Sequence, residues 1–210
     1  MLIGGAASEV AGAEANGVAA TKPGSRPVGR SAASSPRPRL TQAAAGTQIF
    51  TDRTAFLAAL AAGRAENAFD DVAAGASGGL NYAANGFEYL IYTQFGADGA
   101  IYNGPGFIST DRVGDHMVVY LSGNPVTAIG GNFWPVDFAS RPTDGSIDLF
   151  LSDGTQETIE STGPDDFRGF ITTDPIFTLT IDAPDIVSPP PGKSPDRWPA
   201  LDNLIIGNAQ

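Results

Sequence analysis

Cysteine is absent from the 210-residue sequence, and histidine occurs once, as His116. Without cysteine the chain can form no disulfide, no thiolate nucleophile and no cysteine-ligated zinc or iron–sulfur site. A single histidine also excludes the HExxH zinc motif, which needs two. Because His116 begins the apolar run HMVVYLS, we expect it to start a strand rather than to act as a catalytic or metal-binding residue.

Long apolar runs are also missing. No run approaches the roughly 18 residues that a helix needs to cross a bilayer, so we predict no membrane span. The sequence begins MLIGGAASEVAGAEA, with no basic residue ahead of the apolar part and with Glu9 interrupting that part. This beginning therefore lacks the pattern of a clear signal peptide.

Aromatic residues are absent from residues 1–47, which consist mostly of Ala, Gly, Ser, Pro and Thr. Such a segment has too little apolar surface to offset the entropy lost on folding. We therefore predict a flexible, disordered or extended tail over residues 1–47 and one folded domain over residues 48–210. The tail has a net charge of +3 and the whole chain −11, which leaves −14 for the domain. A domain this acidic repels nucleic acid and anionic membranes, so we expect neither as a partner.

One helix and many short strands are indicated in the domain. Residues 51–63 read TDRTAFLAALAAG, in which Thr51 can cap a helix and Gly63 can end it. Turn pairs such as Asn85-Gly86 and Asp153-Gly154 separate the β-rich runs that follow. The expected strands are Ala68–Val72, Phe87–Thr93, Ala100–Asn103, His116–Leu121, Val126–Trp134, Ser146–Leu151, Gln156–Glu160, Phe167–Thr172, Ile176–Asp182 and Asp202–Ile206. This pattern predicts an all-β fold: an antiparallel jelly-roll-like β-sandwich with one short N-terminal helix.

Two stretches are ambiguous from their residues alone. Pro125–Phe138 reads PVTAIGGNFWPVDF and fits either a ligand-binding loop or a strand interrupted by a bulge. Pro184–Pro199 contains six prolines, and proline cannot donate to a sheet ladder. We therefore expect this second stretch to be an excursion between the last two strands, with Trp198 anchoring its return.

Carboxylates are abundant, and exposed carboxylates suit calcium, which binds six to eight oxygens. The sequence contains no EF-hand loop. Asp70 and Asp71 follow the start of the domain, whereas Asp202 begins the last strand, and neighbouring terminal strands would bring them together. We therefore name Asp70, Asp71 and Asp202 as candidate ligands of a structural calcium ion, with no other cofactor indicated. A catalytic pair of carboxylates, as in glycosidases, stays open as an alternative.

Seven segments in a fixed order resemble a known family. They are TDRTAFLAAL, ENAFDDV, NGFEYLIYT, NPVTAIGGNFW, IDLFLSDGT, FRGFITTDPIFTLTI and LDNLIIG, within residues 48–207. Together they are similar to the exported bacterial β-sandwich domains of the PEP-CTERM and choice-of-anchor type, whose Pro-Glu-Pro sorting tail is not present in this sequence. The resemblance implies a non-catalytic, jelly-roll-like domain at the cell surface or in the extracellular matrix of a bacterium, associated with polysaccharide.

The resemblance also implies a structural role for the ambiguous Gly-Gly stretch. In such a domain Val126–Ile129 and Asn132–Trp134 would be core-facing strand. Gly130-Gly131 would form a bulge, and Asp137 would begin the next turn.

Our leading hypothesis is a secreted or cell-surface β-sandwich with a structural, adhesive or carbohydrate-binding role and no catalysis. Exposed aromatic rings can stack on the apolar faces of sugars, and the Gly-rich loop 95–115 would form the binding rim. The candidate ligand-binding residues are Tyr92, Tyr102, Phe107 and Trp198. One alternative is a subunit of a self-assembling filament or matrix, in which Thr41–Phe50 adds a strand to a neighbouring copy. Another alternative is a glycoside hydrolase or polysaccharide lyase.

Overall fold

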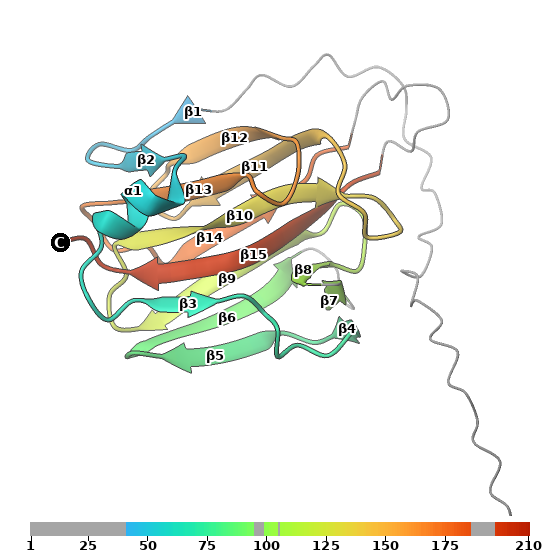
Figure 1. Ribbon diagram of the computed structural model, residues 1–210, viewed down its shortest axis with the longest axis horizontal. Helices are drawn as coiled ribbons and strands as arrows, with labels where there is room; N and C mark the ends of the chain where they lie inside the picture. Colours follow the sequence, from blue (N-terminus) through green and yellow to red (C-terminus); the bar gives the residue numbers. More distant parts are fainter. Residues whose placement is uncertain (1–40, 95–98, 105, 186–195) are drawn as a thin grey trace, which may run out of the picture.

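The computed structural model describes residues 41–94, 99–104, 106–185 and 196–210. Across these ranges the chain forms two antiparallel β-sheets packed face to face, with one short helix outside them (Figure 1). The predicted all-β sandwich with a single short helix is therefore confirmed. The elements are β1 Thr41–Gln42, β2 Gln48–Phe50, α1 Arg53–Ala58, β3 Ala65–Asn67, β4 Gly75–Ser77, β5 Leu80–Ala84, β6 Phe87–Gln94, β7 Ile101–Gly104, β8 Phe107–Thr110, β9 His116–Gly123, β10 Ala128–Val136, β11 Gly145–Leu151, β12 Gln156–Ser161, β13 Phe167–Ile171, β14 Thr178–Asp182 and β15 Trp198–Gly207.

The two sheets differ in strand number. The first has seven strands in the order β1-β12-β11-β14-β9-β6-β5, and the second has eight, with the path β2-β13-β10-β15-β8-β7-β4. Strand β3 is the eighth and pairs with β15, which is long enough for β8 and β3 to pair at different positions along it. Strand β1 is an edge strand of one sheet and β2 is an edge strand of the other. Residues 41–50 therefore supply an edge strand to both sheets on the same side (Figure 1).

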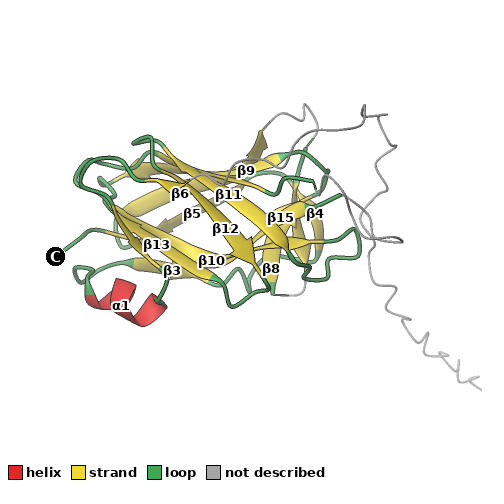
Figure 2. Cartoon of the chain, turned by 90° about the horizontal axis from the view of Figure 1, so that it is seen from above, coloured by secondary structure: helices red, strands yellow, loops and turns green. Residues whose placement is uncertain are grey.

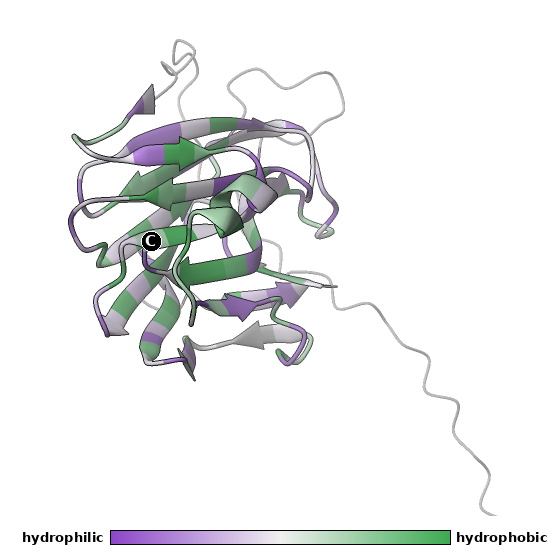
Figure 3. Ribbon diagram, turned by 60° about the vertical axis from the view of Figure 1, so that its left-hand side comes forward, coloured by the Kyte–Doolittle hydropathy of each residue, from purple (hydrophilic) through white to green (hydrophobic). Residues whose placement is uncertain are grey.

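The main core lies between the sheets because alternate residues of each strand point inward. In the eight-stranded sheet, Ile129 and Phe133 of β10 are fully buried there. In the facing sheet, Val119 of β9, Ile147 of β11 and Leu179 of β14 are also fully buried. Hydrophobic and hydrophilic residues consequently form alternating bands along the strands (Figure 3). On a strand that no other element covers, the side chains between the inward-facing ones lie on the outer surface of the sheet.

Helix α1 covers part of the outer face of the eight-stranded sheet (Figure 2). Its Phe56 is fully buried against two glycines of that sheet. An added Cβ would lie 2.6 Å from the Phe56 ring at Gly169 and 2.9 Å from it at Gly130. The missing side chains at these two positions therefore make the space that the ring fills.

The helix is shorter than the predicted span 51–63. Asp52, and not Thr51, caps it, since the Asp52 carboxylate accepts a 2.7 Å hydrogen bond from the backbone N of Ala55. The helix ends at Ala58 because the following chain pairs with the C-terminal residues: the backbone N of Ala61 donates to the carbonyl of Asn208 at 2.9 Å. Gly63 accordingly has no part in ending the helix.

The bulge in the Gly-Gly stretch is present, but the extra residue belongs to the partner strand. Gly130 lies opposite Ile205 and Asn132 lies opposite Asp202, so two steps along β10 match three along β15. The extra residue is accommodated near Asn203, which has a left-handed φ of 51°. All nine residues of β10 are buried, so this stretch is a core strand and not a ligand loop.

The turn after β10 also begins where it was predicted. Asp137 accepts hydrogen bonds from the backbone N of Ala139 at 2.8 Å and of Arg141 at 3.0 Å. Desolvation alone would raise the pKa of Asp137, but these bonds and the Arg141 guanidinium hold it below its usual value.

Nine of the ten expected strands are confirmed with shifted ends, as β6, β7 and β9–β15. The expected strand Ala68–Val72 is wrong, because the strand in this region is β3 and ends at Asn67. Phe69 instead adopts a left-handed φ of 55°, and its N–H donates to the Asn67 side chain at 2.7 Å. Strands β1, β2, β4, β5 and β8 were not predicted; β1 falls inside the expected tail, of which residues 1–40 lie outside the described ranges.

Candidate functional site

Three of the four proposed sugar-stacking rings are core side chains. Tyr102, Phe107 and Trp198 are only 7%, 4% and 4% exposed. Phe107 packs edge-on against Trp134, with ring centroids 5.2 Å apart, and Trp198 belongs to the same buried cluster. Their burial corrects the idea that these rings present a face to a ligand. It does fit the expected anchoring role of Trp198, which is the first residue of β15.

Tyr92 has a different position, since it is half-buried on the outer face of the seven-stranded sheet. It lies opposite Val118 of β9. Tyr120, two residues further along β9, is on the same outer face and is 45% exposed. Diagonal neighbours on adjacent strands are roughly 7–8 Å apart, which long side chains can span. Tyr92 and Tyr120 are therefore diagonal neighbours on this face.

An open cavity of about 410 Å³ lies at the end of the same sheet. Its walls come from the β1–β2, β11–β12 and β13–β14 connections. The lining residues are Ala44, Ala45, Ser152, Asp153, Thr173, Asp174, Pro175 and Phe177. Phe177 is 59% exposed and immediately precedes Thr178, the residue opposite Tyr120. Phe177 is therefore the aromatic residue of the cavity, and Tyr120 lies on the neighbouring strand outside its lining.

Hydrogen bonds fasten the three walls of the cavity to one another. The hydroxyl of Thr47 donates to the Asp153 carboxylate at 2.9 Å, and the N–H of Phe177 donates to the hydroxyl of Ser152 at 2.8 Å. Gly46 has a left-handed φ of 84°, and a Cβ there would lie 2.7 Å from Oγ1 of Thr173. The first wall can approach the third this closely only because residue 46 is glycine. The cavity is therefore held in shape before any ligand binds.

The two acids that line the cavity, Asp153 and Asp174, differ in the hydrogen bonds that their side chains make. The Asp153 carboxylate accepts bonds from the hydroxyls of Thr47 and Thr155 and from the backbone N of Thr155, at 2.8 to 3.0 Å. The exposed Asp174 side chain has no ion-pair or hydrogen-bond partner within the described residues. Asp153 therefore holds the turn, whereas Asp174 is free to contact a ligand.

The candidate calcium ligands are only partly brought together. Asp70 follows β3, which pairs with β15, and it is close enough to Asp202 to raise the pKa of that residue. Burial raises the pKa of Asp202 most, a bond from the backbone N of Asn203 lowers it, and Asp70 raises it again. Across the described ranges, no three His, Asp or Glu side chains form a group that could hold a metal ion.

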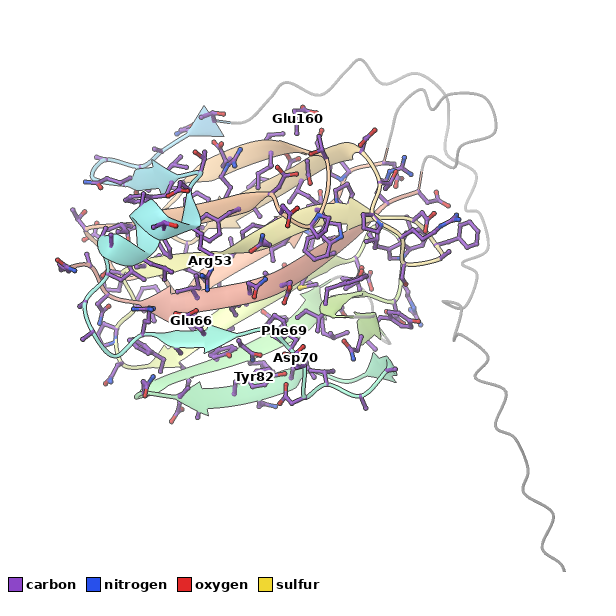
Figure 4. The ribbon with its side chains drawn as sticks, viewed as in Figure 1. Arg53, Glu66, Phe69, Asp70, Tyr82 and Glu160 are labelled. Atoms are coloured by element: carbon purple, nitrogen blue, oxygen red, sulfur yellow. The ribbon has the colours of Figure 1, made fainter. Side chains whose placement is uncertain are left out.

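Asp71, the third candidate calcium ligand, lies beside Tyr82 at the same end of the sandwich. Figure 4 shows Phe69, Asp70 and Tyr82 near one another, and the ring centroids of Phe69 and Tyr82 are 6.0 Å apart. The Tyr82 hydroxyl donates a long, 3.5 Å bond to Asp71. Burial, with the Asp71 charge second, raises the pKa of Tyr82 to about 12. A second tyrosine, Tyr89, stacks on Tyr82 at 5.2 Å.

The structure arranges few groups that resemble a catalytic site. His116 begins β9 as expected, and its Nε2 lies 3.4 Å from the Asp182 carboxylate. Asp182 is opposite Asp148, whose carboxylate accepts a 2.6 Å bond from the Thr158 hydroxyl. Residues 75–79 read GASGG, which matches the GxSxG nucleophile pattern. They form β4 and the approach to β5, however, and not the strand-to-helix turn that this motif requires.

Comparison of the sequence with protein-family models, with curated proteins and with solved structures gives no match. The helix of the described residues has six residues, too few to cross a membrane.

Sequence reasoning missed the two most relevant rings. Tyr120 alternates with the inward-facing Val119 and Leu121, so strand periodicity alone could have placed it on the outside. Phe177 carries no such signal, because its exposure depends on the loop that precedes β14.

Proposed function

We propose that this chain is a non-catalytic polysaccharide-binding β-sandwich that acts outside a bacterial cell. The observation that supports binding is the position of Tyr120 and Phe177. Tyr120 of β9 lies opposite Thr178 of β14, and Phe177, the residue before Thr178, lines a cavity that also contains the exposed Asp174 side chain. The extracellular part of the proposal rests on the resemblance to PEP-CTERM and choice-of-anchor domains.

The chemistry of sugars fits this surface. A pyranose has an apolar face of C–H groups and a rim of hydroxyls, so it is recognised by an aromatic ring with polar groups beside it. In the proposed complex one sugar unit stacks on Phe177, with its hydroxyls near Ser152 and Asp174. A neighbouring unit extends over Tyr120 and the half-buried Tyr92. Because the cavity walls are already bonded to one another, little ordering entropy would oppose binding.

Replacing the exposed rings tests the proposal. An aromatic contact is worth about 1 kcal/mol, so Phe177→Ala and Tyr120→Ala should each weaken polysaccharide binding about fivefold. Phe138→Ala is the matched control, since Phe138 is 55% exposed in the turn after β10 and does not line the cavity. The assay is retention of the chain on a panel of immobilised polysaccharides. If all three substitutions weakened polysaccharide binding equally, or if none of them weakened it, the proposal that this surface binds the polysaccharide would lose its support.

Self-assembly is a second proposal. The segment Thr41–Phe50 supplies an edge strand to each sheet within its own chain, β1 on β12 and β2 on β13. The same hydrogen bonds would form between two chains if neighbouring copies exchanged this segment. Light scattering of the full chain, with and without residues 1–47, tests this proposal. Large particles that disappear on truncation would support exchange, and a monomer of the full chain would contradict it.

The hydrolase or lyase alternative predicts turnover of a polysaccharide that is lost when one carboxylate is replaced. Asp148 and Asp182 are the acids to test first, because they are opposite one another on the outer face of the seven-stranded sheet. Absence of turnover over the whole panel would exclude this alternative for the polysaccharides tested.

A further inference from the structure

The charge of the cavity restricts what it can hold. Both ionisable side chains that line it, Asp153 and Asp174, are acids, and none of its lining residues is Lys, Arg or His. The Asp153 carboxylate accepts three hydrogen bonds, whereas the Asp174 side chain has no partner within the described residues. A ligand placed in this cavity therefore meets one uncompensated negative charge at its rim.

The ring beside that charge favours a cation. Phe177 lies three residues after Asp174, lines the same cavity and exposes 59% of its surface. The face of an aromatic ring attracts an ammonium group, and a carboxylate that lines the same cavity adds Coulombic attraction. A neutral sugar would use the ring and hydrogen bonds from its hydroxyls without this charge attraction, and a uronic acid would be repelled by the carboxylate.

We propose that the cavity recognises a polysaccharide with free amino groups, namely hexosamine units that carry an ammonium group. The ammonium pairs with the Asp174 carboxylate, and the sugar ring packs on Phe177. This proposal rests on the proposed polysaccharide-binding function and names its substrate class. The net charge of −14 over residues 48–210 acts in the same direction, because it draws cationic polymers toward the domain and repels anionic ones.

The test compares three oligosaccharides of equal length: a β-1,4-linked glucosamine, its fully N-acetylated form and a polyuronate. The N-acetylated form has the same backbone without the ammonium charge. Calorimetry on the full chain should show glucosamine binding tighter than the acetylated form by about fivefold or more, and no polyuronate binding. Added salt should reduce this difference because it screens the Asp174 charge.

Two acid-to-amide variants separate a specific pairing from general attraction. Asp174→Asn should remove the preference for glucosamine over the acetylated form. Asp165→Asn removes the same charge from an exposed residue that does not line the cavity. It should leave the preference intact. Equal effects of the two variants would overturn the proposal in favour of non-specific attraction.

The remaining outcomes distinguish this proposal from the function on which it rests. Equal binding of the glucosamine and acetylated forms, lost in Phe177→Ala, would overturn the amino-sugar preference and keep polysaccharide binding. No binding of any oligosaccharide would overturn both. Tighter binding of an oligolysine than of glucosamine, with the same loss in Asp174→Asn, would overturn the amino-sugar proposal and assign the cavity to a basic peptide.

Discussion

Replacing Gly169 by alanine tests whether Gly169 of β13 and Gly130 of β10 leave the space in which the Phe56 ring of the helix packs. The new Cβ would lie 2.6 Å from Cδ2 and 2.7 Å from Cγ of Phe56, closer than any real contact. The ring cannot move aside easily, because Phe50 and Phe167 pack against it at centroid distances of 5.6 and 5.5 Å. Overpacking of this kind costs about 1–3 kcal/mol.

Alanine also stabilises relative to glycine through the unfolded state, by about 0.4–1 kcal/mol where the backbone is compatible. We therefore expect Gly169→Ala to lower the free energy of unfolding by about 1–2 kcal/mol. For a domain of this size that is a fall in Tm of about 2–4 °C for each kcal/mol. Urea unfolding followed by tryptophan fluorescence measures the free energy, and calorimetry measures Tm.

Gly163→Ala is the matched control, because a Cβ at Gly163 would meet nothing within 4 Å. The double variant Gly169→Ala with Phe56→Leu should lose less than the sum of the two single variants, since the smaller side chain vacates the space. If Gly169→Ala were as stable as Gly163→Ala, or if the two losses were simply additive, the proposed seat for Phe56 would be refuted.

Three other substitutions probe the cavity, a tyrosine and the calcium ligands. Gly46→Ala should lower both stability and polysaccharide binding, because φ is 84° and its Cβ would lie 2.7 Å from Thr173. Urea unfolding and retention on immobilised polysaccharide check this, and lost stability with unchanged binding would contradict the role of the cavity. Asp71→Asn should lower the pKa of Tyr82 from about 12, as ultraviolet titration would show; an unchanged pKa would contradict the Asp71 contribution. Because burial raises the pKa of Asp202, its charge is unfavourable at neutral pH. Asp202→Asn should therefore raise Tm in chelator and remove any rise caused by calcium. A calcium-induced rise that survives this substitution would contradict Asp202 as a ligand.

The sequence was most informative where one strand carries its own pattern. The β11–β12 hairpin alternates Ile147, Leu149 and Leu151 with outward residues and turns at Asp153-Gly154, so period and turn agree. The residues of β10 fitted either a loop or a strand, and only the family resemblance favoured the core strand that the structure has. In the hairpin the local preference and the tertiary environment act in the same direction.

The elements that sequence reasoning missed are short strands whose existence depends on a partner. β1 has two residues and β2 and β4 have three, too few for a periodic pattern. β1 forms because Thr41 lies beside Glu157 of β12, a neighbour more than a hundred residues away. The expected strand Ala68–Val72 failed for the opposite reason: apolar residues were present, but Phe69 adopts a left-handed conformation that does not fit an extended strand.

The same dependence on tertiary contacts explains why the first choice of ligand-binding rings was poor. Phe107 and Trp198 lie in an apolar cluster of the eight-stranded sheet, whose outer face is also covered by α1. The large hydrophobic side chains exposed within the described residues are Tyr120, Phe138 and Phe177. Two of these three are at one end of the seven-stranded sheet, where no described element covers the outside (Figure 2). The proposed polysaccharide would therefore meet two exposed rings at this end, whereas Phe107 and Trp198 of the eight-stranded sheet are buried.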